Sequence, residues 1–141
     1  MTRLFSLLLR FLKPLVWLVI ITILCIMPPS NLPPTSLFEI PQFDKIIHFG
    51  MYFVMALLLV HPLEKVYRPG VPPRVLAIDI LLISLAVGGI IEILQFALAY
   101  QRSASWGDLV ADLAGAAAGW LLYFPLLRYL PSLRFIFSAP R

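Results

Sequence analysis

The stretch DKIIHFGMYF, residues 44–53, places an acid, a lysine and a histidine at the start of a long apolar run. Ionisable side chains inside hydrocarbon are unfavourable unless a neighbouring group satisfies them. Asp44, His48 and Tyr52 are four residues apart, so on a helix they share one face. The stretch therefore predicts a membrane helix whose first turns carry a polar face, and that face needs partners on other helices.

The composition of the whole chain predicts the same environment. The chain has 141 residues, the length of one domain, and 61% of them are hydrophobic while 13% are charged. The mean hydropathy is +0.94. A soluble protein of this size could not bury so much apolar surface, so lipid must form part of its solvent. The expected fold class is therefore an all-α, multi-pass membrane protein.

Four apolar stretches are each long enough to cross a hydrocarbon core of about 30 Å, which takes about 20 residues. An amphipathic lead-in precedes the first stretch, which lacks a small-residue cleavage site and is expected to remain as an anchor helix. Prolines favour an extended connection after it, Pro62 is expected to end the second helix, and Pro125 is expected to kink the fourth helix or end it early. We expect a four-helix transmembrane bundle with spans at about residues 10–27, 44–61, 75–98 and 108–127.

The cations predict the orientation of the bundle. Nine of the eleven Lys and Arg residues fall at the two termini and in the second loop, which a four-span topology places on one side of the membrane. Positive charge marks the cytoplasmic side, so both termini are expected in the cytoplasm. The net charge of +4 reflects this bias, and we do not interpret it as a nucleic-acid signal. The nine residues are Arg3, Arg10, Lys13, Lys65, Arg68, Arg74, Arg128, Arg134 and Arg141.

The two remaining cations, Lys45 and Arg102, and most of the acids fall on the opposite, outer side. At about 1.5 Å per residue, His48 and Asp112 each lie about 6 Å inside the outer end of their helices, and Glu92 lies about 9–12 Å below the last loop. Matched depth on three helices predicts one polar pocket that opens outward. The polar faces are Ser84, Gly88, Glu92 and Gln95 on the third span, and Asp108, Asp112, Gly115 and Gly119 on the fourth, where GAAAG is a small-residue packing face.

Some of these residues have simpler interpretations. Asp44 is suited to cap the second helix, and Ser105 with Asp108 has the spacing of a capping box for the fourth. Lys45 and Arg102 also suit a role as interfacial anchors. Glu92 and Asp112 lie well inside apolar sequence, and acids at such positions are a functional hypothesis by default. A purely structural polar network is the alternative.

The ordered set of motifs resembles the VanZ-like family of small bacterial membrane proteins. The resemblance rests on DKIIHFGMYF, on EILQF at residues 92–96 and on QRSASWGDLVADLAGAAAG at residues 101–119, so it is strongest over residues 44–120 of a single domain, 1–141. Asp112 departs from the family pattern, in which asparagine is more common. The resemblance implies a bacterial cytoplasmic membrane location and a binding site formed by Asp44, Lys45, His48, Glu92, Gln95, Arg102, Asp108 and Asp112.

The resemblance also implies a function in the cell envelope, because the family is associated with resistance to teicoplanin. We expect the outward pocket to engage an envelope lipid, a lipid-linked cell-wall precursor or a lipoglycopeptide antibiotic. Membrane lipids are the expected partners, nucleic acid is not, no cofactor is expected, and no feature specifies an oligomeric state. Binding needs only oriented polar groups beside an apolar wall, which this sequence supplies.

An enzyme acting on a lipid-linked substrate at the outer leaflet is the alternative. His48 would be its general acid or base, oriented by Asp44 or Asp108, and the catalytic candidates are His48, Glu92 and Asp112. No recognised nucleophile motif is present, so the sequence does not decide whether the chain is an enzyme. No metal site is predicted, although these three candidates could chemically hold one. An ion-coupled carrier is disfavoured, because the spans are short and show neither repeats nor breaks.

Overall fold

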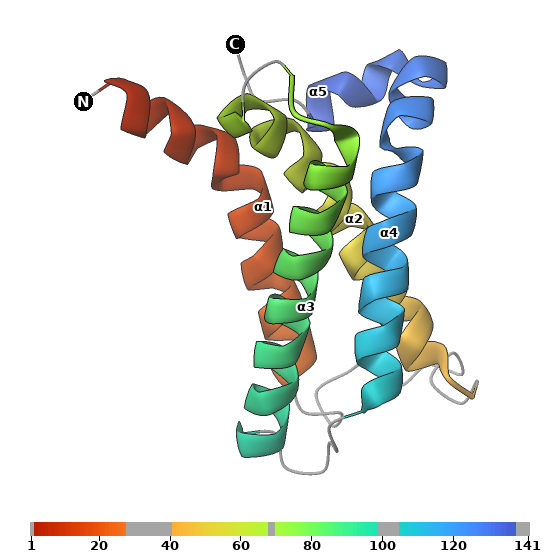
Figure 1. The fold of residues 1–141 in the computed structure, drawn as a ribbon. Coiled ribbons are helices and arrows are strands. Elements are labelled where there is room, and N and C mark those ends of the chain that lie inside the picture. Colours follow the sequence, from red (N-terminus) through yellow and green to blue (C-terminus); the bar gives the residue numbers. More distant parts are fainter. Residues whose placement is uncertain (1, 28–40, 68–69, 99–104, 138–141) are drawn as a thin grey trace.

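The structure is a computed structural model that describes residues 2–27, 41–67, 70–98 and 105–137. No strand occurs within these ranges, and four long helices form the bundle in Figure 1. Each of the four is long and apolar enough to cross a membrane, which confirms the predicted all-α, multi-pass fold class. The elements are α1 (Thr2–Ile26), α2 (Phe43–Tyr67), α3 (Pro73–Leu98), α4 (Trp106–Tyr129), η3 (Pro131–Leu133) and α5 (Arg134–Phe137).

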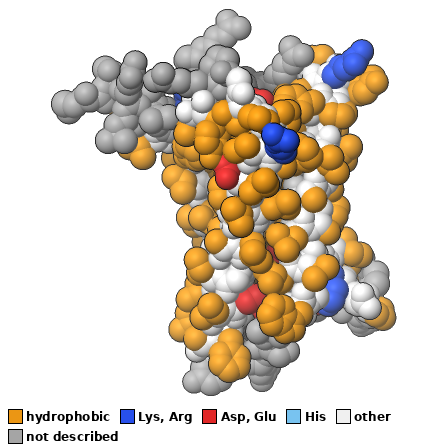
Figure 2. All heavy atoms as spheres, in the orientation of Figure 1, with side chains coloured by type: hydrophobic (Ala, Val, Ile, Leu, Met, Phe, Trp, Pro, Cys, Tyr) orange, Lys and Arg blue, Asp and Glu red, His pale blue; other side chains and the backbone are white. Residues whose placement is uncertain are grey.

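The bundle has two ends that differ in their connections (Figure 1). At one end, which we call the α5 end, α5 lies near the last turns of α2 and α4 and the first turn of α3. At the opposite end, which we call the site end, α1 and α3 finish and α2 and α4 begin. Hydrophobic side chains cover most of the visible surface between the two ends, as Figure 2 shows. Lipid would solvate this apolar surface.

Helix boundaries differ from the expected ones at the prolines. Helix α2 was expected to stop at Pro62, but it continues to Tyr67 with Pro62 inside it. A proline inside a helix costs about 3 kcal/mol. Both Pro62 and its neighbour Leu63 are buried, so the packing of this last turn offsets that cost. Helix α4 likewise continues through Pro125 to Tyr129.

The most buried of the four helices is α2. About 61% of its membrane span is buried inside the bundle, against 17–28% for the other three spans. Tyr52, Ala56 and Val60 on this helix have no exposed surface. In Figure 1, α2 lies behind α3 and α4, and it contacts each of the other long helices. Near the site end, neighbouring helices cover His48 and Tyr52 of α2, whereas Ile46 and Phe49 stay exposed.

Helices α2 and α4 make the most extensive contact in the bundle. A Cβ atom at Gly115 would overlap the backbone carbonyl of Phe49, and one at Gly119 would lie 2.5 Å from the carbonyl oxygen of Phe53. Only glycine leaves room for this contact at either position. The small-residue face predicted from GAAAG therefore packs against another helix of the same chain, and it fixes the start of α4 beside the start of α2.

Candidate functional site

A buried histidine–aspartate pair joins α2 to α4 near the site end. His48 Nδ1 donates a hydrogen bond of 2.9 Å to Asp112 Oδ1. The two residues are only 6% and 1% exposed. The sequence predicted Asp44 or Asp108 as the acid that orients His48, and this was wrong. The glycine contact that sets the rotation of α4 points Asp112 at the histidine instead.

Helix α3 packs against Asp112 of this pair at Gly88. A Cβ atom at Gly88 would lie 2.7 Å from Asp112 Oδ2 and 3.4 Å from the hydroxyl oxygen of Tyr52. Gly88 therefore lets both polar side chains approach the backbone of α3. The hydroxyl of Tyr52 interacts electrostatically with the carboxylate of Asp112. The four-residue spacing between His48 and Tyr52 predicted that both lie on this face of α2.

Lys45 forms ion pairs with acids in the first turns of α2 and α4 at the site end. Its Nζ lies 3.3 Å from Asp44 Oδ2 and 3.5 Å from Asp108 Oδ1. The stem of Lys45 crosses Gly107, where a Cβ atom would lie 2.6 Å from Cε. Ser105 makes no side-chain capping bond, so the predicted capping box does not form, and Asp108 is instead a buried partner of Lys45.

The two polar residues of α3 face different neighbours. Gln95 Nε2 donates to the backbone carbonyl of Cys25 over 2.9 Å, which ties α3 to the last turn of α1. Glu92 Oε2 accepts a 2.8 Å hydrogen bond from the backbone N–H of Ser105. Glu92 also lies within electrostatic reach of His48 and of both aspartates of α4. The structure thus groups Glu92 with the α2–α4 polar residues and places Gln95 at the α1 contact.

Arg102, which was also expected at this site, lies outside the described residues. Among the residues that are described, no three His, Cys, Asp or Glu side chains are grouped so that they could hold a metal ion. The chemistry that the described site can supply is therefore ion pairing and hydrogen bonding by carboxylates, one lysine and one histidine.

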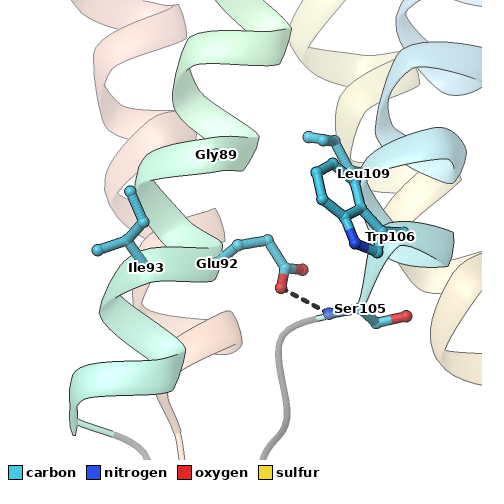
Figure 3. Close-up of a pocket in the computed structure, with 6 residues that line it drawn as sticks. All are labelled: Gly89, Glu92, Ile93, Ser105, Trp106 and Leu109. Carbon is cyan, nitrogen blue, oxygen red and sulfur yellow. Dashed lines mark hydrogen bonds between the residues drawn. The ribbon is translucent and has the colours of Figure 1, made fainter.

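A pocket of about 270 Å³ lies between α3 and α4 at the site end (Figure 3). Its wall is mostly apolar, and Glu92 extends from α3 across it toward the side chains of α4. His48 and Asp112 do not line it. The polar residues that were expected in one outward cavity are therefore divided between the buried pair and this neighbouring pocket. The lining residues are Gly89, Glu92, Ile93, Ser105, Trp106 and Leu109.

These features define a small, multi-pass helical membrane protein with a buried His–Asp pair and an apolar pocket at one end of the bundle. The model of the VanZ/LLP1 family matches residues 3–128, and the chain belongs to this family. The resemblance drawn from residues 44–120 is thereby confirmed and extends over α1. Searches of curated proteins and of solved structures found no match.

Proposed function

We propose that this VanZ/LLP1 protein binds an amphiphile of the cell envelope at its site end. An apolar chain segment would occupy the pocket between α3 and α4, and the polar head would contact Glu92 and the charged groups at the start of α4. The amphiphile would be a membrane lipid, a lipid-linked cell-wall precursor or a lipoglycopeptide antibiotic. The pocket is the observation that carries this proposal, because it combines apolar walls with one oriented carboxylate.

The size and position of the pocket support this proposal. Its volume of about 270 Å³ lies just below the usual range for ligand pockets, about 300–1,000 Å³, and suits one chain segment with part of a head group. Ile93 and Trp106 are 68% and 82% exposed, so its rim faces the surroundings of the bundle. Tryptophan is enriched where membrane meets water, which suits a site at the level of lipid head groups.

The position of His48 favours binding over catalysis. A general acid or base must come within hydrogen-bond reach of the proton that it transfers. His48 is 6% exposed, uses Nδ1 for Asp112 and does not line the pocket. A ligand in the pocket would meet Glu92 first. We therefore assign the His48–Asp112 pair to holding α2 and α4 together behind the pocket, and not to a reaction.

Photocrosslinking would test the binding proposal directly. p-Benzoylphenylalanine at position Ile93 places the reactive group on the pocket wall, and the same residue at Val19 of α1, which is 57% exposed, samples bulk lipid. After irradiation of bacterial membranes, mass spectrometry identifies the adducts. One class of amphiphile should be enriched at Ile93 relative to Val19, and teicoplanin is expected to compete because its acyl chain suits the same walls. Identical adduct profiles at the two positions would refute the proposal.

We further propose that the protein lies in the bacterial cytoplasmic membrane with both termini in the cytoplasm, so that the site end faces outward. Lys65, Arg74 and Arg128 are at the α5 end, as the positive-inside rule requires for this orientation. In a Cys25→Ala background, a membrane-impermeant maleimide on intact cells should label a cysteine at Gln42 and spare one at Lys65. The reverse pattern would contradict this orientation.

A further inference from the structure

One oxygen of the Glu92 carboxylate accepts a hydrogen bond, and the other has no hydrogen-bond partner among the described residues. Oε2 accepts the backbone N–H of Ser105 over 2.8 Å, which fixes the carboxylate between α3 and the start of α4. Oε1 is buried and has no hydrogen-bond partner among the residues that the structure describes. Buried acceptors are nearly always satisfied, because leaving one unpaired is unfavourable. The free oxygen therefore indicates a donor that a ligand would bring.

The indole of Trp106 lines the same pocket as Glu92. Figure 3 shows the side chain of Glu92 reaching from α3 toward Trp106 and Leu109 on α4. Trp106 lines the pocket and is 82% exposed, so a face of its ring is open to a ligand. The face of an indole attracts a cation, and a carboxylate at the same place adds to that attraction. The pocket therefore offers a cation two complementary contacts.

The surrounding charge favours a cation as well. At the site end, the described acids are Asp44, Glu92, Asp108 and Asp112, whereas the only described Lys or Arg there is Lys45. That lysine already lies between two of the acids. A head group with only negative charge would meet net repulsion at Glu92. A positively charged group would be attracted.

We propose that the head group bound in this pocket carries a protonated primary amine, whose N–H donates to Glu92 Oε1 while the ammonium lies against the ring of Trp106. The inference rests on the proposed binding of an amphiphile and names the chemical class of its head. A primary ammonium fits better than a quaternary one, because Oε1 needs an N–H donor and a quaternary ammonium has none. Two sources carry this chemistry next to an apolar chain: an aminophospholipid and an acylated peptide with a free amine.

The experiment uses the full chain with p-benzoylphenylalanine at Ile93, in nanodiscs that contain equal amounts of three lipids with identical acyl chains. Their heads are ethanolamine, choline and glycerol. The yield of the phosphatidylethanolamine adduct should exceed each of the others by at least about tenfold, the effect of one charge-assisted hydrogen bond. An acylated lysine peptide is added as a competitor. Strong competition would identify the peptide amine as the better ligand, and weak competition the phospholipid.

Two variants test the assigned atoms. Glu92→Gln keeps an acceptor for the Ser105 N–H but removes the charge, and it should bring the three adduct yields close to parity. Glu64→Gln makes the same change on α2 near the α5 end and should leave the preference intact. An increase in amine binding after Arg102→Gln would mean that Arg102 is the resident partner of Glu92, and would overturn the assignment.

Different photocrosslinking results would refute the primary amine and the binding of an amphiphile. Ile93 adducts that stay enriched over Val19 but show no amine preference, or a preference that survives Glu92→Gln, would refute the amine and leave amphiphile binding standing. Ile93 adducts no different from those at Val19 would refute both.

Discussion

Helix α4 makes two contacts of opposite character near the site end. Toward α2 it is closed, because Gly115 brings its backbone against that of Phe49 and the His48–Asp112 bond crosses the contact. Toward α3 it is open, because Trp106 and Leu109 face Gly89 and Glu92 across a pocket. The difference shows what each residue type does between helices. Glycine facing backbone lets two helices touch, whereas the outward-facing Trp106 and the missing side chain at Gly89 leave a space.

The largest effect is expected from filling the closed contact. Gly115→Leu would place a side chain where the carbonyl of Phe49 lies, so α2 and α4 must separate. Overpacking costs about 1–3 kcal/mol when side chains can adjust, and more when backbone must move. We expect this variant to lose the folded bundle, as measured by unfolding in detergent micelles followed by circular dichroism. A wild-type unfolding midpoint would mean that α2 and α4 are not in contact at this position.

Breaking the buried pair should have the next largest effect. Asp112→Ala removes the acceptor of His48 and leaves a buried polar ring without its partner, which should lower the free energy of unfolding by about 3 kcal/mol. Asp112→Asn keeps an acceptor oxygen at this position, so its loss of stability should be clearly smaller. Equal losses for both variants would contradict the role of the hydrogen bond.

A smaller effect is expected from Lys45. Lys45→Gln removes the ion pairs with Asp44 and Asp108, but the lysine side chain is 32% exposed and water screens such pairs. We expect a loss of stability below that of Asp112→Ala, and one that shrinks further as salt is added. A loss that is independent of salt would mean that packing of the lysine stem over Gly107 matters more than its charge.

The smallest effect on stability is expected at the open contact. A Cβ atom at Gly89 meets nothing within 4 Å, so Gly89→Leu should fold as well as the unmodified chain or gain up to about 1 kcal/mol from its better helix propensity. The same unfolding measurement checks this value. A large destabilisation would mean that the space beside Gly89 is not a pocket.

Much of the fold could be predicted from the sequence, because hydrophobic length identifies each membrane span by itself. The similar depth of His48 and Asp112 was also predicted, because both lie on polar faces near the start of their helices. The ends of α2 and α4 were less predictable. Pro62 and Pro125 are strong local signals for a helix end. Helix α2 nevertheless continues past Pro62, because the packing of buried neighbours such as Leu63 stabilises its last turn. Tertiary packing here overrides local preference.

The detailed pairing of the site could not be predicted in the same way. Spacing shows which residues share a face, but it does not give the rotation of one helix against another. That rotation decides that Asp112 and not Asp108 meets His48, and that Lys45 takes Asp108. It also turns Gln95 toward Cys25 while Glu92 faces α4. Trp106 and Leu109 line the pocket because α3 and α4 lie side by side, and spacing along the sequence does not show that arrangement.

The most direct test of the account compares lipid adducts at Ile93 in two matched leucine variants. Gly89→Leu fills the pocket, whereas Gly50→Leu makes the same substitution at an exposed position of α2 where a Cβ atom also meets nothing within 4 Å. Both proteins should fold alike. Enrichment of the amphiphile at Ile93 should be lost in Gly89→Leu and kept in Gly50→Leu. Equal enrichment in both variants would show that the space between α3 and α4 is not where the ligand binds.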